Sequence, residues 1–295
     1  MTENKALLGR LAIVGTALIW GTSFVILKTT LDSIDTMWIL AIRFSVSAAL
    51  LGLAGWKQLR KMDRAVVRGS VIMGCFLAAA YIVQTYGLKY TTPGKNAFLT
   101  ATYCVLVPFM AWGVYRRRPD ASNIAAAFLC IIGIGLVSLG GQNGAMNIGD
   151  ALTLLCGVFY GIQIIMMEQY AGKGDALSIT AVQFAAGAVV CWVGALLFEQ
   201  PPVNVPASAW MSVAYMSVMC TAVCFFLQAW GMKYTPSSTT AVIMTLESVF
   251  GTVISIVFYH EAMSFRLVLG FVLIFAAVLI SETKFSYLKK RRQRA

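Results

Sequence analysis

Charged residues and histidines are scarce in this chain of 295 residues. Asp, Glu, Lys and Arg make up 12% of the positions, and the sequence contains one histidine, His260. A soluble domain is typically about 25% charged, so the composition argues against a soluble protein. One histidine cannot form a multi-histidine metal site, and the seven cysteines form no CxxC motif. We therefore expect no bound metal and no disulfide framework.

Motifs of nucleotide-driven pumps and common hydrolases are also missing. Gly94-Lys95 is preceded by Lys89, where a phosphate-binding loop needs glycine, and is followed by Asn96 instead of Ser or Thr. Neither G-x-S-x-G nor H-E-x-x-H occurs in the sequence. We expect neither an ATP-driven pump nor an enzyme, and no cofactor.

Long apolar runs dominate what is present, because hydrophobic residues fill 59% of the positions. A transmembrane helix needs about 20 apolar residues. Backbone groups in hydrocarbon must pair within their own segment, so each run should be helical. The sequence predicts an all-α membrane protein with ten transmembrane helices, at residues 8–28, 36–56, 67–87, 96–115, 123–141, 150–169, 177–198, 210–231, 238–259 and 266–283.

The basic residues give the orientation of these spans. With the N-terminus inside, the inner segments hold eighteen Lys and Arg, and the outer segments hold four, which are Lys28, Lys89, Lys95 and Arg266. This asymmetry predicts that both termini are cytoplasmic. The net charge of +11 has no accompanying aromatic-basic stripe, so we expect no nucleic-acid partner.

The second half of the chain repeats features of the first. Paired positions lie 140 residues apart at Trp20-Gly21 and Tyr160-Gly161, at Asp35 and Asp175, and at Arg43-Phe44 and Gln183-Phe184, and the segment 84–91 recurs 144 residues later at 228–235. An odd number of spans in each half would invert the second half. The sequence thus predicts two inverted five-helix repeats, 1–142 and 143–295, an arrangement typical of secondary transporters.

Several of these segments carry a family resemblance. They are Trp20-Gly21-Thr22-Ser23-Phe24, Arg43-Phe44, the segment 87–97, Leu106-Val107-Pro108-Phe109, Arg116-Arg117-Arg118-Pro119, the segment 231–235, Glu247 and His260-Glu261. On these motifs the chain resembles EamA-like permeases of the drug/metabolite transporter superfamily. The resemblance implies ten helices, a central cavity lined by spans 1–4 and 6–9, peripheral spans 5 and 10, and export. The chain departs from the pattern at Ser248, where many relatives have proline.

Arg43 and Glu247 are the two charges that lie deepest in the predicted spans. A charge near the centre of a transmembrane helix costs about 2.5–3.5 kcal/mol on insertion scales, so something must offset it. In the functional interpretation, Arg43 holds an anionic group of a substrate and Glu247 holds an amino group or a proton. In the structural interpretation, the two pair with each other or with carbonyls and fix helix packing.

Polar and aromatic residues inside the spans suggest the lining of a cavity, with helix–helix hydrogen bonding as the alternative. They are Trp20, Ser23, Tyr81, Gln84, Thr85, Tyr103, Tyr160, Gln163, Gln183 and Gln228. Pro108 should bend the fourth span, as a hinge or as a static kink.

These features predict a secondary carrier in the cytoplasmic (inner) membrane that exports a small metabolite, an amino-acid-like solute or a drug by alternating access. Its expected partners are the small-molecule substrate, the lipid bilayer and protons as a candidate coupling ion, and the expected assembly is a monomer or homodimer. A low-dielectric site disfavours a charged carboxylate, so Glu247 is the first candidate to carry the proton. An uncoupled pore or facilitator, and a membrane assembly subunit that transports nothing, remain the alternatives.

Overall fold

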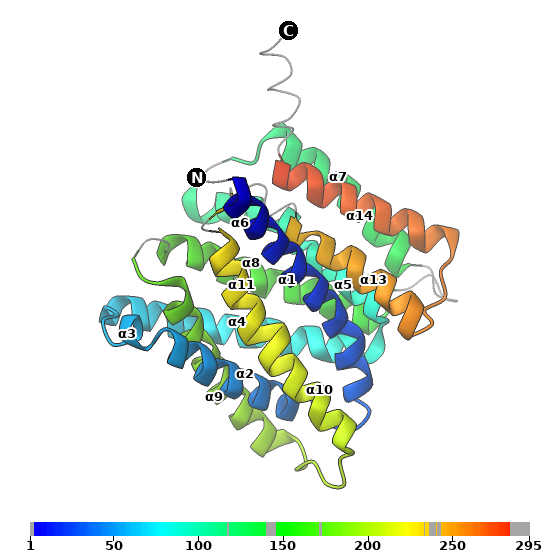
Figure 1. The fold of residues 1–295 in the computed structure, drawn as a ribbon. Coiled ribbons are helices and arrows are strands. Elements are labelled where there is room, and N and C mark those ends of the chain that lie inside the picture. Colours follow the sequence, from blue (N-terminus) through cyan, green and yellow to red (C-terminus); the bar gives the residue numbers. More distant parts are fainter. Residues whose placement is uncertain are drawn as a thin grey trace.

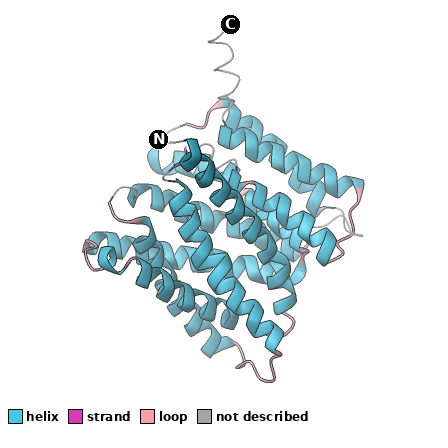
Figure 2. Cartoon of the chain, viewed as in Figure 1, coloured by secondary structure: helices cyan, strands magenta, loops and turns pink. Residues whose placement is uncertain are grey.

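The computed structural model describes residues 3–116, 118–139, 146–170, 173–232, 234–235, 240 and 243–283. Within these ranges the chain is built from helices joined by short connections and contains no strand (Figures 1 and 2). The predicted all-α fold is therefore confirmed. The residues outside the described ranges include Arg117, Lys233, Pro236-Ser237, positions 238, 239, 241 and 242 at the start of the ninth span, and the basic tail 284–295.

Most helices match a predicted span. Their bounds are α1 Glu3–Thr30, α2 Thr36–Ala54, α3 Trp56–Leu59, α4 Arg64–Tyr90, α5 Pro93–Ala101, α6 Tyr103–Tyr115, α7 Ala121–Ser138, α8 Ile148–Tyr170, α9 Ala176–Phe198, α10 Ala207–Ser217, η1 Val218–Val223, α11 Cys224–Met232, α13 Leu246–Phe258 and α14 Phe265–Thr283. Among the described residues, 8 helical segments are long and apolar enough to cross a membrane, and two shorter apolar helices, Leu246–Phe258 and Phe265–Ser281, follow them. The chain has the helices of a multi-pass membrane protein, whereas the count of ten spans stays a prediction.

Local sequence explains where several helices begin. The side chains of Asp63, Thr92, Asp120 and Asp175 each accept a hydrogen bond from a backbone N–H in the first turn of the helix that follows. Such caps satisfy N–H groups that have no partner within the helix. Pro93 stands in the first turn of α5, where its missing N–H costs nothing.

The fourth predicted span is interrupted at Thr102, between α5 and α6. The Thr102 hydroxyl donates to the carbonyl of Leu99 at 2.6 Å. Pro108 lies further along, inside α6. Proline leaves the carbonyl four residues earlier without its usual donor, and this carbonyl, of Cys104, accepts a hydrogen bond from the Ser281 hydroxyl at 3.1 Å. The break in helical structure is therefore at Thr102, whereas the carbonyl that Pro108 leaves without its helical donor has another donor.

The helices pack in antiparallel pairs that join the earlier part of the chain to the later part. Along α2 and α9, the rings of Phe44 and Phe184 have centroids 5.3 Å apart, Gly55 lies against Ser178, and Gly194 lies against Met37. The pair α4 and α8 and the pair formed by α1 with α10, η1 and α11 are also in contact. Helices α7 and α14 pack against each other at one edge of the bundle, where Gly133 approaches Gly270 (Figure 1).

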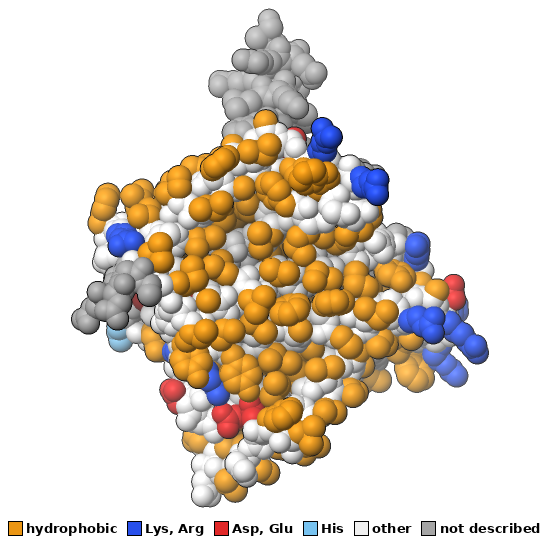
Figure 3. Space-filling model, turned by 180° about the vertical axis from the view of Figure 1, so that it is seen from behind, with side chains coloured by type: hydrophobic (Ala, Val, Ile, Leu, Met, Phe, Trp, Pro, Cys, Tyr) orange, Lys and Arg blue, Asp and Glu red, His pale blue; other side chains and the backbone are white. Residues whose placement is uncertain are grey.

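The surface is apolar over the sides of the bundle. Hydrophobic side chains cover most of the face seen in Figure 3, and Lys and Arg side chains lie mainly at its margins. Large exposed hydrophobic residues occur on α7, α9 and α14, among them Phe128, Leu197 and Phe265. This distribution suits a protein whose sides face hydrocarbon.

The connections between helices gather at two ends of the bundle. We call the end at the start of α1 the near end; there Gly9 lies against Gly231 and Tyr234. The near end also holds the connections after α2, α6 and α8. We call the opposite end the far end, and it holds the connections after α1, α4, α7, α9 and α13. There the Lys28 ammonium donates to the carbonyls of Leu88, Lys89 and Thr91 at 2.7, 2.9 and 3.0 Å.

Candidate functional site

Arg43 lies on α2 and is buried, with 3% of its surface exposed. Its Nε donates to Thr221 Oγ1 at 2.8 Å, and its guanidinium carbon lies 5.1 Å from the centroid of the Tyr81 ring. In the described part of the chain, no carboxylate oxygen lies within 4.0 Å of it. The guanidinium charge is therefore met by a neutral hydroxyl and an aromatic face, which leaves it able to bind an anionic group.

A π-helical segment, η1, positions the partner of Arg43 in the middle of the eighth predicted span. The wider turn frees carbonyls from their usual helical partners. Trp20 Nε1 donates to the carbonyl of Cys220 at 2.6 Å, and the Ser47 hydroxyl donates to the carbonyl of Ser217 at 2.9 Å. Helices α1 and α2 thus both bind this segment, at the same level as Arg43.

Glu247 lies in the first turn of α13, just after Thr245. A carboxylate is favoured at a helix N-terminus by the exposed N–H groups and the helix dipole. Glu247 is partly accessible and accepts no hydrogen bond from any residue the structure describes. It interacts electrostatically with Arg43, yet the two side chains have no nitrogen–oxygen distance within 4.0 Å. The two charges therefore lie near enough to interact but do not form a direct ion pair.

Three tyrosines and a glutamine extend this site along α4, α6 and α8. The rings of Tyr81 and Tyr160 have centroids 5.7 Å apart, and those of Tyr103 and Tyr160 have centroids 6.0 Å apart. The Tyr160 hydroxyl donates to Gln84 Oε1 at 2.9 Å, and Gln84 Nε2 donates to Thr100 Oγ1 at 2.9 Å. The buried amide of Gln84 is thus satisfied and holds the Tyr160 hydroxyl in place.

Seven aromatic rings form a continuous row through the bundle, and Arg43 lies over one of them. Successive ring centroids are 5.1–6.0 Å apart, within the range of favourable aromatic contacts. In order, the rings are Trp20, Phe225, Phe184, Phe44, Tyr81, Tyr160 and Tyr103. The row crosses both parts of the chain and forms a rigid wall beside the two charges.

The remaining predicted lining residues have other surroundings. Gln163 Nε2 donates to Gln183 Oε1 at 2.8 Å, so this pair joins α8 to α9. The Ser23 hydroxyl donates to the carbonyl of Trp20 within α1 at 2.7 Å. Gln228 makes no side-chain hydrogen bond to a described residue. The Thr85 hydroxyl is buried and has no partner in the described ranges. The structure therefore joins Arg43, Tyr81, Gln84, Tyr103, Tyr160 and Trp20 through contacts, with Glu247 linked to them electrostatically.

Three carboxylates of the later part of the chain bind the earlier part at the far end. Glu261 accepts hydrogen bonds from the Thr92 hydroxyl, from the Gly94 N–H at 2.9 Å and from the Ser255 hydroxyl at 2.5 Å. It is buried, and it caps the N-terminus of α5. The motif His260-Glu261 contributed to the family resemblance, but no local pattern predicted the contacts that Glu261 makes.

The other two carboxylates act in the same way. Glu199 accepts from the N–H groups of Met37 and Trp38 at 2.9 and 3.3 Å and from the Tyr86 hydroxyl at 2.9 Å. Asp150 accepts from the Thr91 hydroxyl at 2.5 Å and from the Lys95 ammonium at 3.4 Å. We call Asp150, Glu199 and Glu261 the far-end clamp. At the near end, the described carboxylates Asp63 and Asp175 cap their own helices instead.

Comparisons with known proteins place the whole chain in one group. The profile of the EamA-like transporter family matches residues 7–139 and 147–283. A protein of Archaeoglobus fulgidus called an uncharacterized transporter is 30% identical over 278 residues, which cover 94% of this chain and 86% of that protein. The uncharacterized transporter YoaV of Bacillus subtilis is 21% identical, with 94% and 97% covered. A solved structure with 19% identity superposes with a TM-score of 0.66 over 95% of this chain and 98% of its own, which bears on the fold alone.

Proposed function

Because the chain belongs to the EamA-like transporter family, we propose that it is a secondary carrier which exports a small, amino-acid-like solute by alternating access. The relatives that match along their length are named transporters, and the family is not one of enzymes. The substrate, the direction and the mechanism are the parts of the proposal that go beyond the family.

The proposal rests on one observation: Arg43 and Glu247 interact electrostatically but form no direct ion pair. Two opposite charges that face one site would normally form a direct pair in a low-dielectric surrounding, because that offsets their desolvation. These two stay apart, and a solute with a carboxylate and an ammonium group could neutralise both at once. The Tyr81 and Tyr160 rings beside them provide an apolar wall with polar hydroxyls, which suits a small solute with a carbon side chain.

Matching contacts in the two parts of the chain support a rocking motion of two inverted repeats, 1–142 and 143–295. Asp35 precedes α2 as Asp175 precedes α9. Thr102 and Thr245 both precede the second segment of an interrupted span, with nearly equal backbone angles. Gly21 lies against Phe250, and its counterpart Gly161 lies near Val107. Two related halves around one central site can open in turn to opposite sides.

We propose that the near end is cytoplasmic and that the carrier lies in the plasma membrane, since most basic residues belong to near-end segments. The far-end clamp then closes the outer side in the described conformation. With the outer side closed, alternating access would require this state to exchange solute with the cytoplasm, as an exporter does when it loads its substrate. A reporter enzyme fused to the C-terminus should be active only inside the cell, and activity only outside would contradict this orientation.

Glu247 is our candidate for the group that binds the coupling proton, which is exchanged for the substrate. A carboxylate inside a span that accepts no hydrogen bond from a described residue has little to hold its charge when no solute is bound. An imposed pH gradient should therefore drive uptake into proteoliposomes. Uptake that ignores the gradient would remove the coupling but leave the carrier proposal intact.

Counterflow in proteoliposomes tests the carrier proposal. Vesicles that contain the purified protein are loaded with unlabelled L-amino acids, and the entry of a pool of ¹⁴C-labelled L-amino acids is followed. A carrier predicts accelerated and saturable entry of at least one labelled solute. Entry that is independent of the internal load would indicate a pore, and the absence of entry above that of empty vesicles would contradict transport of this substrate class.

A further inference from the structure

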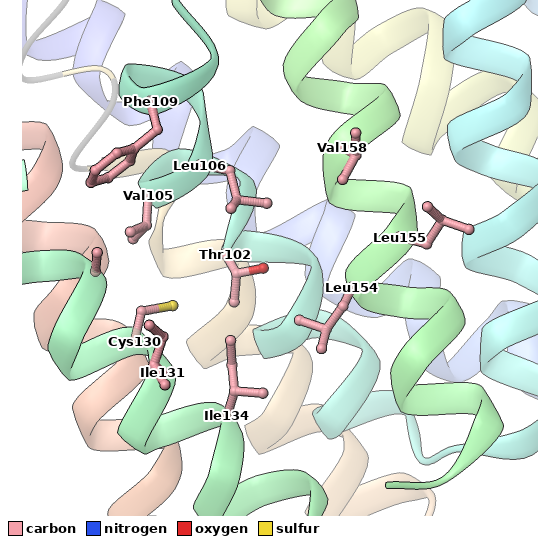
Figure 4. Close-up of a pocket in the computed structure, with 11 residues that line it drawn as sticks. Thr102, Val105, Leu106, Phe109, Cys130, Ile131, Ile134, Leu154, Leu155 and Val158 are labelled. Atoms are coloured by element: carbon pink, nitrogen blue, oxygen red, sulfur yellow. The ribbon is translucent and has the colours of Figure 1, made fainter. Parts of the chain in front are cut away.

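An apolar groove lies between α6, α7 and α8, apart from the Arg43 site. It has a volume of about 410 Å³ and is lined by Thr102, Val105, Leu106, Phe109, Ala127, Cys130, Ile131, Ile134, Leu154, Leu155 and Val158 (Figure 4). Its one hydroxyl, that of Thr102, is already bound to the carbonyl of Leu99. The groove therefore offers no free polar group of the kind that would select a polar solute.

The groove opens on the side of the bundle that faces lipid. Ile131 on α7 is 66% exposed and Leu155 on α8 is 44% exposed, so the rim is accessible from outside the helices. The lining begins at Phe109, which precedes Arg116 at the near end of α6 by about 10 Å of helix, and it ends at Thr102 about 10 Å deeper. Since half of a bilayer's hydrocarbon core is about 15 Å thick, the groove straddles the depth that acyl chain ends reach.

A second observation lies at the near end of the same helices. Arg116 ends α6 in a left-handed conformation, and both Arg116 and Arg118 are exposed in the connection to α7. The Tyr115 hydroxyl donates to the carbonyl of Ile165 at 3.1 Å, which fixes this end of α6 against α8. Two exposed arginines thus follow the near end of α6, about 10 Å along the chain axis from the start of the groove lining, at a depth where they can bind a lipid phosphate.

We propose that this groove binds one anionic phospholipid, with an acyl chain between α6, α7 and α8 and its phosphate on Arg116 and Arg118. The basic residues select the anionic headgroup, and the groove selects the tail. The bound chain would fill space beside Thr102, where the fourth span is interrupted, and would hold α6 in its described position. The lipid site does not depend on the identity of the transported solute.

Photo-cross-linking tests the site on the unaltered protein. The purified chain in detergent is mixed with phosphatidylglycerol that carries a diazirine near the end of one acyl chain, irradiated, digested and mapped by mass spectrometry. We expect adducts on the groove segments of α6, α7 and α8, and we expect excess phosphatidylglycerol to suppress them more than excess phosphatidylcholine does. Adducts spread equally over exposed residues elsewhere, such as Val189 of α9, would overturn the proposal.

Variants test the two parts of the site separately by native mass spectrometry. Replacing both arginines (Arg116→Gln with Arg118→Gln) should weaken phosphatidylglycerol binding by about 30-fold and leave phosphatidylcholine binding unchanged. Ala127→Trp should fill the groove and reduce binding of both lipids. The matched controls are Arg60→Gln with Lys61→Gln, also exposed at the near end, and Val189→Trp on the lipid-facing side of α9. Equal effects of the test and control variants would contradict the assigned site.

Discussion

Glu261→Gln should loosen the far end of the bundle. In the described conformation one carboxylate accepts three hydrogen bonds, from Thr92, Gly94 and Ser255. The glutamine side chain keeps one acceptor oxygen, but its amide nitrogen can only donate. Gly94 and Ser255 both donate to Oε2 of Glu261, so the glutamine oxygen can keep these two bonds while the amide nitrogen donates to the Thr92 hydroxyl. The substitution therefore keeps the contacts but removes the negative charge that strengthens them at the N-terminus of α5.

A hydrogen bond to a charged group contributes about 1.5–3 kcal/mol and a neutral one about 0.5–1.5 kcal/mol, so the weakening of three bonds together costs about 1.5–3 kcal/mol. If the clamp holds the far end shut, this loss should raise the population open at the far end by about 10-fold to 150-fold, because 1.4 kcal/mol corresponds to a factor of ten. The opening should also extend beyond the contacts of Glu261. Glu199 and Asp150 hold the beginnings of α2 and α8 at the same end, so these contacts should open together with those of Glu261.

Hydrogen–deuterium exchange followed by mass spectrometry measures this opening through the backbone amides it exposes. In Glu261→Gln, exchange should accelerate in peptides that cover residues 91–101, 36–41 and 148–153. Glu168→Gln, which alters an exposed carboxylate on α8, is the control and should leave all three unchanged. Faster exchange in 91–101 alone would mean that Glu261 acts only as a local helix cap. Unchanged exchange in all three peptides would contradict the claim that the clamp holds the far end closed.

Three further substitutions test packing and the site. Phe44→Ala removes a fully buried ring and should lower the free energy of unfolding by about 3–5 kcal/mol, seen as a lower Tm in detergent, whereas Leu53→Ala, at a position 73% exposed, should change it little. Gly74→Ala should also lower the Tm, because its Cβ would lie 2.4 Å from a carbonyl oxygen of α9, while Gly52→Ala meets nothing within 4 Å and should be neutral or stabilising. Thr221→Val removes the acceptor of Arg43 Nε, at a cost of about 1–3 kcal/mol, and should reduce counterflow while the protein remains in the membrane.

Hydropathy and periodicity were enough to predict most of the helices, because bilayer thickness and backbone pairing leave few choices. The predicted spans 150–169 and 177–198 differ from α8 and α9 only at their ends, where caps such as that of Asp175 decide the boundary. The interruption at Thr102 was not predicted. Proline pointed to a bend at Pro108 instead, and a threonine inside an apolar run gives no local signal of a break.

The sequence singled out residues of the candidate site, but it did not predict the contacts that they make. Arg43 and Glu247 stood out because charge is rare in a span. The structure places Arg43 over the Tyr81 ring, and Glu247 near enough to interact electrostatically with Arg43. The π-helical segment that presents Thr221 to Arg43 has no signature in the sequence. The far-end clamp was missed because its carboxylates lie at span ends, where acidic residues are ordinary, and their partners in the earlier part of the chain lie 55 to 169 residues away. Only packing brings such pairs together.

The central claim is that Arg43 and Glu247 bind the two charged groups of one solute. Counterflow of the labelled amino-acid pool should be compared in Arg43→Gln, Glu247→Gln and the exposed controls Arg68→Gln and Glu168→Gln, at equal amounts of reconstituted protein. The account predicts that each site variant loses exchange almost completely and that both controls keep it. Exchange close to that of the unaltered protein in Arg43→Gln and Glu247→Gln would contradict the claim.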